Sequence, residues 1–196
     1  NKLGTIYHLF STHQNAQQVA GDPDFVNVRN LQMQDFSAFI DAQNIPANEA
    51  VIFGGDMNVD KHANFLNEYN EMFSIFNASE PTYVGHPNTW DKYANHYVDL
   101  GSVEPEYLDY VLADNDYLVP NEQSNETWVL RSNHDDMWNI HDLSDHFGVL
   151  GRFVFPETIN PCASTTITIN SSVTEETYEN ANDGTADITV SGGTAP

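Results

Sequence analysis

The fold of this chain is decided by the stretch Ala50-Val51-Ile52-Phe53-Gly54-Gly55-Asp56-Met57-Asn58. Four apolar residues followed by a glycine pair predict a short buried strand whose end is exposed. Asp56 and Asn58 are two positions apart, so they lie on one side of that strand end and point outward. The carboxylate can bind a hard divalent cation or orient a water, and the carboxamide can donate to a phosphoryl oxygen without adding negative charge. By itself the motif is also common as plain turn chemistry.

Three further segments place a histidine or an aspartate at the edge of a strand-like run. They are Thr12-His13, Leu108-Asp109-Tyr110 and Ser144-Asp145-His146. With the first motif they supply a base, a carboxylate to orient it, a cation ligand and donors for phosphoryl oxygens. Metal-assisted attack of water on a phosphate ester requires this set. The candidate site residues are His13, Asp56, Asn58, Asp109, Asp145 and His146.

In this order the motifs resemble those of the endonuclease/exonuclease/phosphatase superfamily. Within it the chain is similar to the secreted bacterial sphingomyelinases C over roughly residues 3–155. The likeness extends to the connecting segments 44–59, 76–81, 83–86, 89–91 and 105–110. The resemblance implies an α+β fold, namely the second half of a four-layer α/β/β/α sandwich of the DNase I-like type.

The resemblance also implies that part of the domain lies outside this sequence. Family members are nearly twice as long as the matching part, and their first half carries an Asn and a Glu that bind the catalytic magnesium. We therefore expect the chain to be a fragment whose partner is the missing N-terminal half of the same domain. Without half of a two-sheet core, it is expected to fold poorly and to be inactive.

For the complete enzyme the resemblance implies a sphingomyelin phosphodiesterase of the phospholipase C type. It would release phosphocholine and ceramide from a choline phospholipid in membranes. His146, oriented by Asp109, would take a proton from water, which attacks phosphorus in line with the leaving ceramide oxygen. Asp56 and Asn58 would position the water and the phosphoryl group, while His13 would donate to a non-bridging oxygen.

The cofactor implied by the resemblance is one divalent cation, Mg²⁺ or another such as Mn²⁺ or Co²⁺. The missing acidic residue would hold it mainly. In this chain the candidate metal ligands are Asp56, Asp145 and His146.

Membrane contact is where the chain departs from these relatives, which often carry an exposed aromatic pair on a hairpin before the Ser-Asp-His motif. Here that stretch contains Met137 and Trp138. Trp favours the bilayer interface, so both residues are candidates for membrane contact. The neighbouring Asp135 and Asp136 oppose docking on anionic lipid, and a packed Trp138 is the alternative.

Composition limits the classes of substrate. Six Lys and Arg stand against 29 Asp and Glu, a net charge of −23. Such a field repels polyanions, so no nucleic-acid partner is expected. The resemblance implies a protein that is secreted or at the cell surface. Two alternatives remain: another phosphoesterase or nuclease of the superfamily, and a non-catalytic secreted surface domain.

Hydrophobic spacing predicts alternating strands and helices. Strands are expected at 4–11, 50–55, 107–113 and 147–155, and helices at 24–43 and 61–76. Asp60 is the expected N-cap of the second helix. The apolar and aromatic stripes of both helices are expected to face the core. In the first helix the stripe consists of Phe25, Val28, Leu31, Phe36, Phe39 and Ile40. Residues 77–106 and 114–142 are expected to be long polar connections.

Composition also predicts a domain boundary after the last catalytic motif. Residues 1–156 form the predicted C-terminal half of the catalytic domain, and 157–165 form a linker. Residues 166–196 are rich in Thr, Ser, Asn and Gly, with alternating Ile and Val. This alternation predicts exposed strands of a partial β-rich module, similar to surface-protein repeats, with a linker as the alternative.

Overall fold

The computed structural model describes residues 5–16, 23–63, 67–98, 104–132, 142–156, 168–175, 177, 179, 181 and 183–191. It divides the chain into two compact units, Asn1–Pro156 and Glu157–Pro196. All six candidate catalytic residues belong to the first unit.

One sheet of the first unit brings the catalytic motifs to a common edge. Its strands, in spatial order, are β1 (Tyr7–His13), β2 (Ala50–Asp56) and β4 (Asp109–Ala113). β1 runs parallel to β2, and β4 runs antiparallel to it. The register pairs His13 with Asp56 and Asp56 with Asp109, so the three side chains start from one line across the sheet.

The glycine pair of the opening motif permits this close pairing. Gly55 has φ 139°, in the region that favours glycine, and a Cβ there would lie 1.9 Å from the Thr12 carbonyl oxygen. A Cβ on Gly54 would lie 2.5 Å from the Tyr110 carbonyl oxygen. Both distances are far below van der Waals contact. Any side chain would therefore push β2 away from its neighbours and misalign the sheet edge.

A second sheet packs on the first. Its strands, in spatial order, are β3 (Thr82–Gly85), β5 (Glu122–Trp128) and β6 (Gly148–Val154). β3 is parallel to β5, and β5 is antiparallel to β6. The Asn125 side chain of β5 bonds both the N–H and the C=O of Val111 in β4, at 2.8 and 2.7 Å. This buried amide ties the two sheets face to face.

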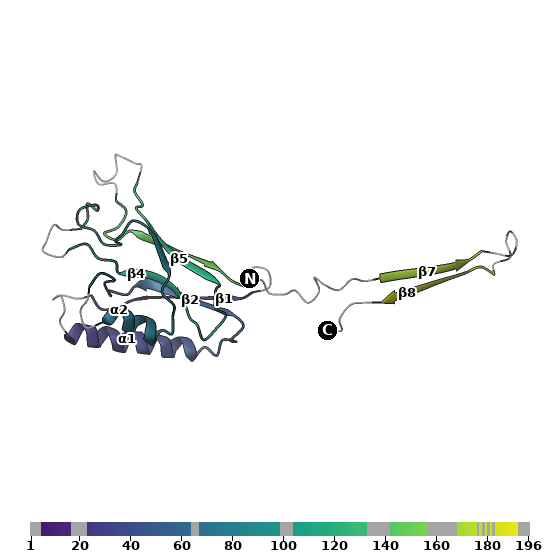
Figure 1. Ribbon diagram of the computed structural model, residues 1–196, viewed down its shortest axis with the longest axis horizontal. Helices are drawn as coiled ribbons and strands as arrows, with labels where there is room; N and C mark the ends of the chain where they lie inside the picture. The colour runs from purple at the N-terminus through teal and green to yellow at the C-terminus, as the bar shows by residue number, and fades with distance from the viewer. Residues whose placement is uncertain are drawn as a thin grey trace. The chain divides into compact units, whose positions relative to one another are not determined.

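Two helices, α1 (Pro23–Asp41) and α2 (Glu68–Ile75), cover the other face of the first sheet (Figure 1). The rings of Phe36, Phe53 and Phe76 meet in this layer, with centroids 4.7 to 6.1 Å apart. The described part of the unit is thus three layers: helices, sheet β1-β2-β4 and sheet β3-β5-β6. The α+β class expected from the sequence is confirmed.

The predicted strands lie close to those observed, but two strands escaped prediction. The expectation that 77–106 and 114–142 are connections was wrong, because β3 and β5 lie within them. β3 has only four residues, and the buried positions of β5 are polar, Asn125 and Thr127. The apolar alternation that marks a strand is therefore absent.

The prediction for the inward face of the first helix was partly wrong. Val28, Leu31 and Phe39, expected to be core residues, are exposed. Ile40 is buried as expected, and the rest of the buried face of α1 consists of Val26, Arg29 and Met33. These residues also follow helical spacing, but a buried arginine among them breaks the apolar pattern from which the face was predicted.

The second helix starts later than predicted, and Asp60 is not its N-cap. α2 begins at Glu68, preceded by Asn67 in a left-handed conformation with φ 56°. Asp60 Oδ1 instead accepts hydrogen bonds from the backbone N–H groups of Tyr107 and His62. Its carboxylate holds the loop after β2 against the segment before β4.

The second unit contains a two-stranded antiparallel hairpin of β7 (Thr168–Thr174) and β8 (Thr185–Ser191). The alternating sequence predicted strands here, and these are observed. Ile169 and Ile188 are 67% and 69% exposed, so the described hairpin buries little apolar surface. Within the described ranges of the whole chain, no helix has the length and apolar character needed to cross a bilayer.

Candidate active site

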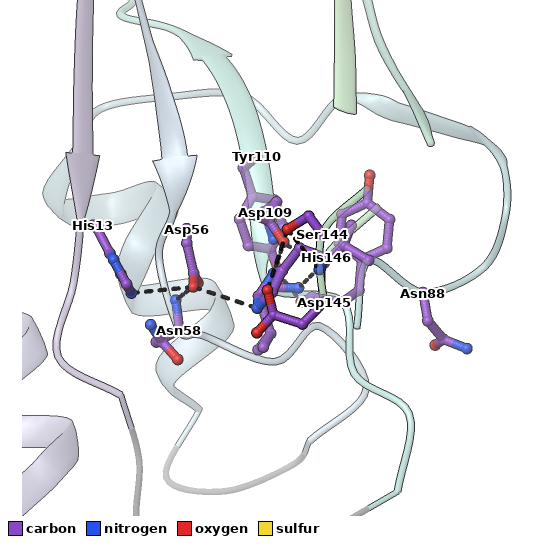
Figure 2. A network of polar contacts seen from close by, with 12 residues as sticks. His13, Asp56, Asn58, Asn88, Asp109, Tyr110, Ser144, Asp145 and His146 are labelled. Carbon is purple, nitrogen blue, oxygen red and sulfur yellow. Dashed lines mark hydrogen bonds and ion pairs between the residues drawn. The ribbon is translucent and has the colours of Figure 1, made fainter. Parts of the chain in front are cut away.

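The sheet edge gathers the predicted catalytic side chains into one network of polar contacts (Figure 2). Asp56 lies at its centre, at the end of β2. His13 contacts it from the end of β1, with Nε2 3.3 Å from Asp56 Oδ2. His146 approaches from the other side, with Nε2 3.8 Å from the same oxygen. Figure 2 also labels Asn58, Asp109 and Asp145 in this network, so all six predicted residues lie in it or directly beside it.

Asp109 orients the imidazole of His146. His146 Nδ1 lies 2.7 Å from Asp109 Oδ2. An ionised carboxylate only accepts hydrogen bonds, so Nδ1 carries the proton and the neutral ring leaves Nε2 as an acceptor. That nitrogen is the one that faces Asp56. The arrangement is that of a histidine base held in one tautomer by a carboxylate.

The loop after β2 fixes Asp56 through Asn58. The Asn58 backbone N–H donates to Asp56 Oδ1 at 2.9 Å, and its side-chain Nδ2 donates to the Gln14 carbonyl at 3.0 Å. Asn58 has φ 50°, a left-handed conformation that Asn tolerates better than most residues. One of the two amide hydrogens on Nδ2 is engaged by Gln14, and the second remains for another acceptor.

Burial and like charge destabilise the ionised carboxylate at the centre. Burial raises the pKa of Asp56, and the charge of Asp109 raises it further. The Asn58 N–H and the two histidines oppose this shift only in part. A bound cation would relieve the repulsion between these two carboxylates.

The pKa of His146 is raised above its ordinary value of 6.5. Burial alone would lower it. The hydrogen bond to Asp109 and the charges of Asp109, Asp56 and Asp145 outweigh that effect. The surroundings of this imidazole therefore stabilise the positive charge it would gain on taking a proton.

Three of these residues form a candidate metal-binding group. One ligand atom from each of Asp56, Asp109 and His146 lies within 4.8 Å of the others. Two carboxylates fit a hard cation such as Mg²⁺, which is held in proteins by one or two carboxylates, waters and substrate phosphates. The group contains Asp109, where the sequence suggested Asp145. Asp145 is exposed, and its carboxylate accepts a hydrogen bond from the adjacent Ser144 hydroxyl at 3.2 Å.

The predicted membrane-contact residues Met137 and Trp138 lie outside the described residues. Their role stays a prediction.

Thr89 is a supporting residue that the sequence did not reveal. Its buried hydroxyl accepts hydrogen bonds from the backbone N–H groups of Leu108 and Asp109, at 2.9 and 3.2 Å. It fixes the start of β4 and with it the Asp109 carboxylate. A lone threonine in a polar connection carries no sequence signal for this role.

A second missed network anchors the loop that carries His146. Asp142 is buried and accepts hydrogen bonds from Arg131 Nε at 2.8 Å and from the His96 backbone N–H at 2.8 Å. The His96 ring adds a contact of 2.6 Å. Asn95 donates to the Ser144 carbonyl at 2.8 Å. Burial alone would raise the pKa of Asp142, but these partners lower it to about 2.

Replacing Asp142 by asparagine is expected to destabilise the protein by about 2 kcal/mol at neutral pH, because hydrogen bonds to a charged group are lost. The folded pKa of about 2 lies below the ordinary 3.8, so ionised Asp142 contributes stability above about pH 4. That contribution is lost as the pH falls through about 2. Urea unfolding of the complete native protein and of Asp142→Asn at several pH values measures the difference. A gap that stays constant from pH 7 to pH 2 would contradict this assignment.

Comparison with known proteins shows one recurring likeness. No family model matches the chain. Sphingomyelinase C of Leptospira interrogans is 33% identical over 174 residues, covering 84% of this chain and 30% of the relative. A sphingomyelinase C of Bacillus cereus is 38% identical over 161 residues, covering 76% of this chain and 48% of the relative.

A solved structure agrees with these relatives. The crystal structure of a beta toxin variant from Staphylococcus aureus with bound magnesium ions matches with a TM-score of 0.63 at 29% identity. The match covers 74% of this chain and 51% of that chain. The chain spans half or less of the length of the curated relatives reported above.

Proposed function

Because this chain belongs to the bacterial sphingomyelinase C family over the part it shares with those proteins, we propose that its complete protein is a metal-dependent sphingomyelin phosphodiesterase. The reaction releases phosphocholine and leaves ceramide. The observation that carries the proposal is the Asp109–His146 pair, whose free Nε2 faces Asp56.

In this reaction His146 Nε2 accepts a proton from the attacking water, and Asp109 holds the ring and stabilises the imidazolium that forms. Asp56 and Asn58 orient the water and the phosphoryl group. His13 is 72% exposed in its side chain, so it is free to donate to a non-bridging phosphoryl oxygen. Negative charge on that oxygen grows in the transition state, where such donors act most strongly.

The divalent cation is Mg²⁺ in this proposal, with Asp56 and Asp109 as the carboxylate ligands and His146 beside them. Asp145 remains a candidate for a place near the ion. A bound Mg²⁺ supplies charge stabilisation for the phosphoryl oxygens. Two carboxylates are an incomplete Mg²⁺ shell, which agrees with a further ligand from the rest of the family's domain.

The proposal has three further parts. Activity requires the N-terminal half of the catalytic domain. The substrate is a choline phospholipid in membranes, with Met137 and Trp138 as candidates for contact with the lipid surface. The protein acts outside the cell, secreted or at the surface. The family relationship and the net charge of −23, which disfavours nucleic acid, support these parts.

Phosphocholine release from sphingomyelin tests the proposal directly. The native full-length preparation is expected to release phosphocholine with added Mg²⁺, to stop when a chelator is added, and to recover when Mg²⁺ is restored. Residues 1–196 expressed alone serve as the matched control and are expected to be inactive. Hydrolysis of only a soluble phosphodiester would move the function to the broader phosphoesterase class. Inactivity on both substrates would favour a non-catalytic surface domain.

A further inference from the structure

A second set of side chains lies beside the reaction centre and is not used by the proposed chemistry. Trp90 forms antiparallel bridges with two residues at once, Glu106 on one side and His146 on the other. The pairing with Glu106 is reciprocal: the Trp90 N–H donates to the Glu106 carbonyl at 3.0 Å, and the Glu106 N–H donates back at 2.9 Å. Across antiparallel strands, directly opposed residues project to the same face. Trp90 and Glu106 therefore start on the face from which His146 reaches the reaction centre.

The electrostatics of Glu106 agree with this placement. Burial, followed by the charges of Asp60 and Asp56, raises the pKa of Glu106 to about 7. The charges of Arg29 and His146 act in the opposite direction. Two candidate catalytic residues, Asp56 and His146, are thus among the groups whose charges act on the Glu106 carboxyl. The strand pairing places Glu106 opposite Trp90, which in turn lies opposite His146.

Both side chains are unpartnered within the described ranges. Glu106 is half-buried, yet its carboxylate makes no hydrogen bond or ion pair with any described residue. Trp90, also half-buried, has no ring contact with another aromatic residue of those ranges. A half-buried carboxylate without a partner is costly, and a cation bound beside it would restore its ionised form. An indole face next to it is the best aromatic surface for a cation.

The chemistry of this pair selects a quaternary ammonium rather than a metal ion. An aromatic face attracts a bulky, weakly hydrated cation, and one carboxylate neutralises it. A divalent cation would need several oxygen ligands, and Glu106 belongs to no group of three candidate ligands among the described residues. In a choline ester, two carbons and an ester oxygen separate the ammonium from phosphorus. This separation allows the phosphate to bind at His146 while the ammonium of the same substrate binds at the adjacent strand.

We infer that Trp90 and Glu106 form the subsite for the quaternary ammonium of the substrate head group. The inference rests on the proposed phosphodiesterase function and adds to it the residues that select choline. Trp90 binds the trimethylammonium group through its ring, and Glu106 supplies the opposite charge. Because Trp90 pairs with His146 on one side and with Glu106 on the other, head-group binding also places the phosphoryl group near the base.

The test compares two soluble esters in the complete native protein. One is p-nitrophenyl phosphorylcholine, and the other is its 3,3-dimethylbutyl analogue, in which a neutral carbon replaces the ammonium nitrogen. Soluble esters avoid any contribution from membrane docking. The native protein is expected to prefer the choline ester in kcat/KM. Trp90→Leu and Glu106→Gln are each expected to reduce that preference about tenfold. Hydrolysis of the neutral ester should change by less than about twofold.

Matched controls come from the same residue types elsewhere on the first unit. Trp128 is 44% exposed at the end of β5, and Glu104 is an exposed partner of Lys92. Trp128→Leu and Glu104→Gln should leave the preference unchanged. Thermal unfolding of every variant identifies a loss that comes from misfolding.

Several results would overturn the inference while leaving the phosphodiesterase function intact. One is an equal loss on both esters in folded Trp90→Leu and Glu106→Gln variants, which indicates a structural role. Another is an unchanged preference, and a third is a higher Mg²⁺ requirement in Glu106→Gln with the preference retained. If the native protein hydrolyses neither soluble ester, phosphocholine release from sphingomyelin decides whether the proposed function holds. Calorimetric binding of phosphocholine then still tests the subsite: binding that both variants weaken about tenfold supports it, and binding that they do not weaken overturns it.

Discussion

Replacing His146 by alanine is expected to lower kcat for phosphodiester hydrolysis by about 10²- to 10⁴-fold, the usual contribution of a positioned general base. In the proposed mechanism the free Nε2 of His146 accepts the proton of the attacking water. Asp109 holds the imidazole in one tautomer through its contact with Nδ1. Without it, the attacking water keeps its proton until late in the reaction. Folding should change little, because the imidazole lies at the edge of the sheet and not in its core.

The measurement is the steady-state rate of phosphocholine release by the complete native protein and its variants, with unfolding curves alongside. His8→Ala is the matched control, since His8 lies near the other end of β1, where it pairs with Glu49. Asp109→Asn is expected to lower kcat almost as much as His146→Ala. The new amide can donate a hydrogen bond to His146 Nδ1 and so favour the wrong tautomer of the imidazole. Unchanged turnover in His146→Ala would refute the assignment of the base.

The second large effect is on stability and concerns a buried ion pair between the helices. Arg29 on α1 is fully buried, and its guanidinium binds Glu68 on α2 in a bidentate pair, with distances of 2.6 and 2.7 Å. Arg29→Met is expected to lower the free energy of unfolding by about 3–5 kcal/mol, because it leaves a buried carboxylate unpaired. Glu68→Leu is expected to lower the free energy of unfolding by a similar amount, because it leaves the buried Arg29 guanidinium unpaired.

The double variant separates this explanation from simple loss of packing. Arg29→Met combined with Glu68→Leu removes both charges, so its stability should return to within about 1–2 kcal/mol of the native protein. Arg152→Met is the control, since Arg152 is 60% exposed in its pair with Glu126 and such pairs contribute about 0–1 kcal/mol. Urea unfolding of the complete protein measures all four. If the loss of unfolding free energy in the double variant equals the sum of the losses in the two single variants, the ion-pair explanation is contradicted.

The same arginine also connects the helix layer to the active site. Arg29 Nη1 donates to the Asn15 carbonyl at 3.3 Å. Asn15 follows Gln14, whose own carbonyl accepts the Asn58 side chain. The strand end that carries His13 is thus held from both sides, by the helices and by the loop after β2.

Much of the fold could be predicted from local patterns in the sequence. Residues 50–58 predicted a buried strand with an exposed end, and β2 ends at Asp56. Prediction from local pattern succeeded here because a few neighbouring residues are enough to specify an apolar strand or a glycine-rich strand end. It failed for β5, because its buried residues Asn125 and Thr127 are polar and satisfied only by distant partners. It failed for the face of α1 for the same reason: Arg29 is buried because Glu68, 39 residues away, neutralises it.

The sequence by itself determined which chemical groups the site holds, since His13, Asp56, Asn58, Asp109 and His146 each belong to a short motif at a strand edge. Only the tertiary structure decided how they combine. Sheet register pairs Asp109 with Asp56, and a hydrogen bond joins Asp109 to His146. Asp109 is therefore both the partner of the proposed base and a member of the candidate metal group, while Asp145 is exposed. The tertiary structure also places Trp90, part of no catalytic motif, between Glu106 and the proposed base His146. Motifs are local, whereas distances between side chains depend on strand pairing across gaps of tens of residues.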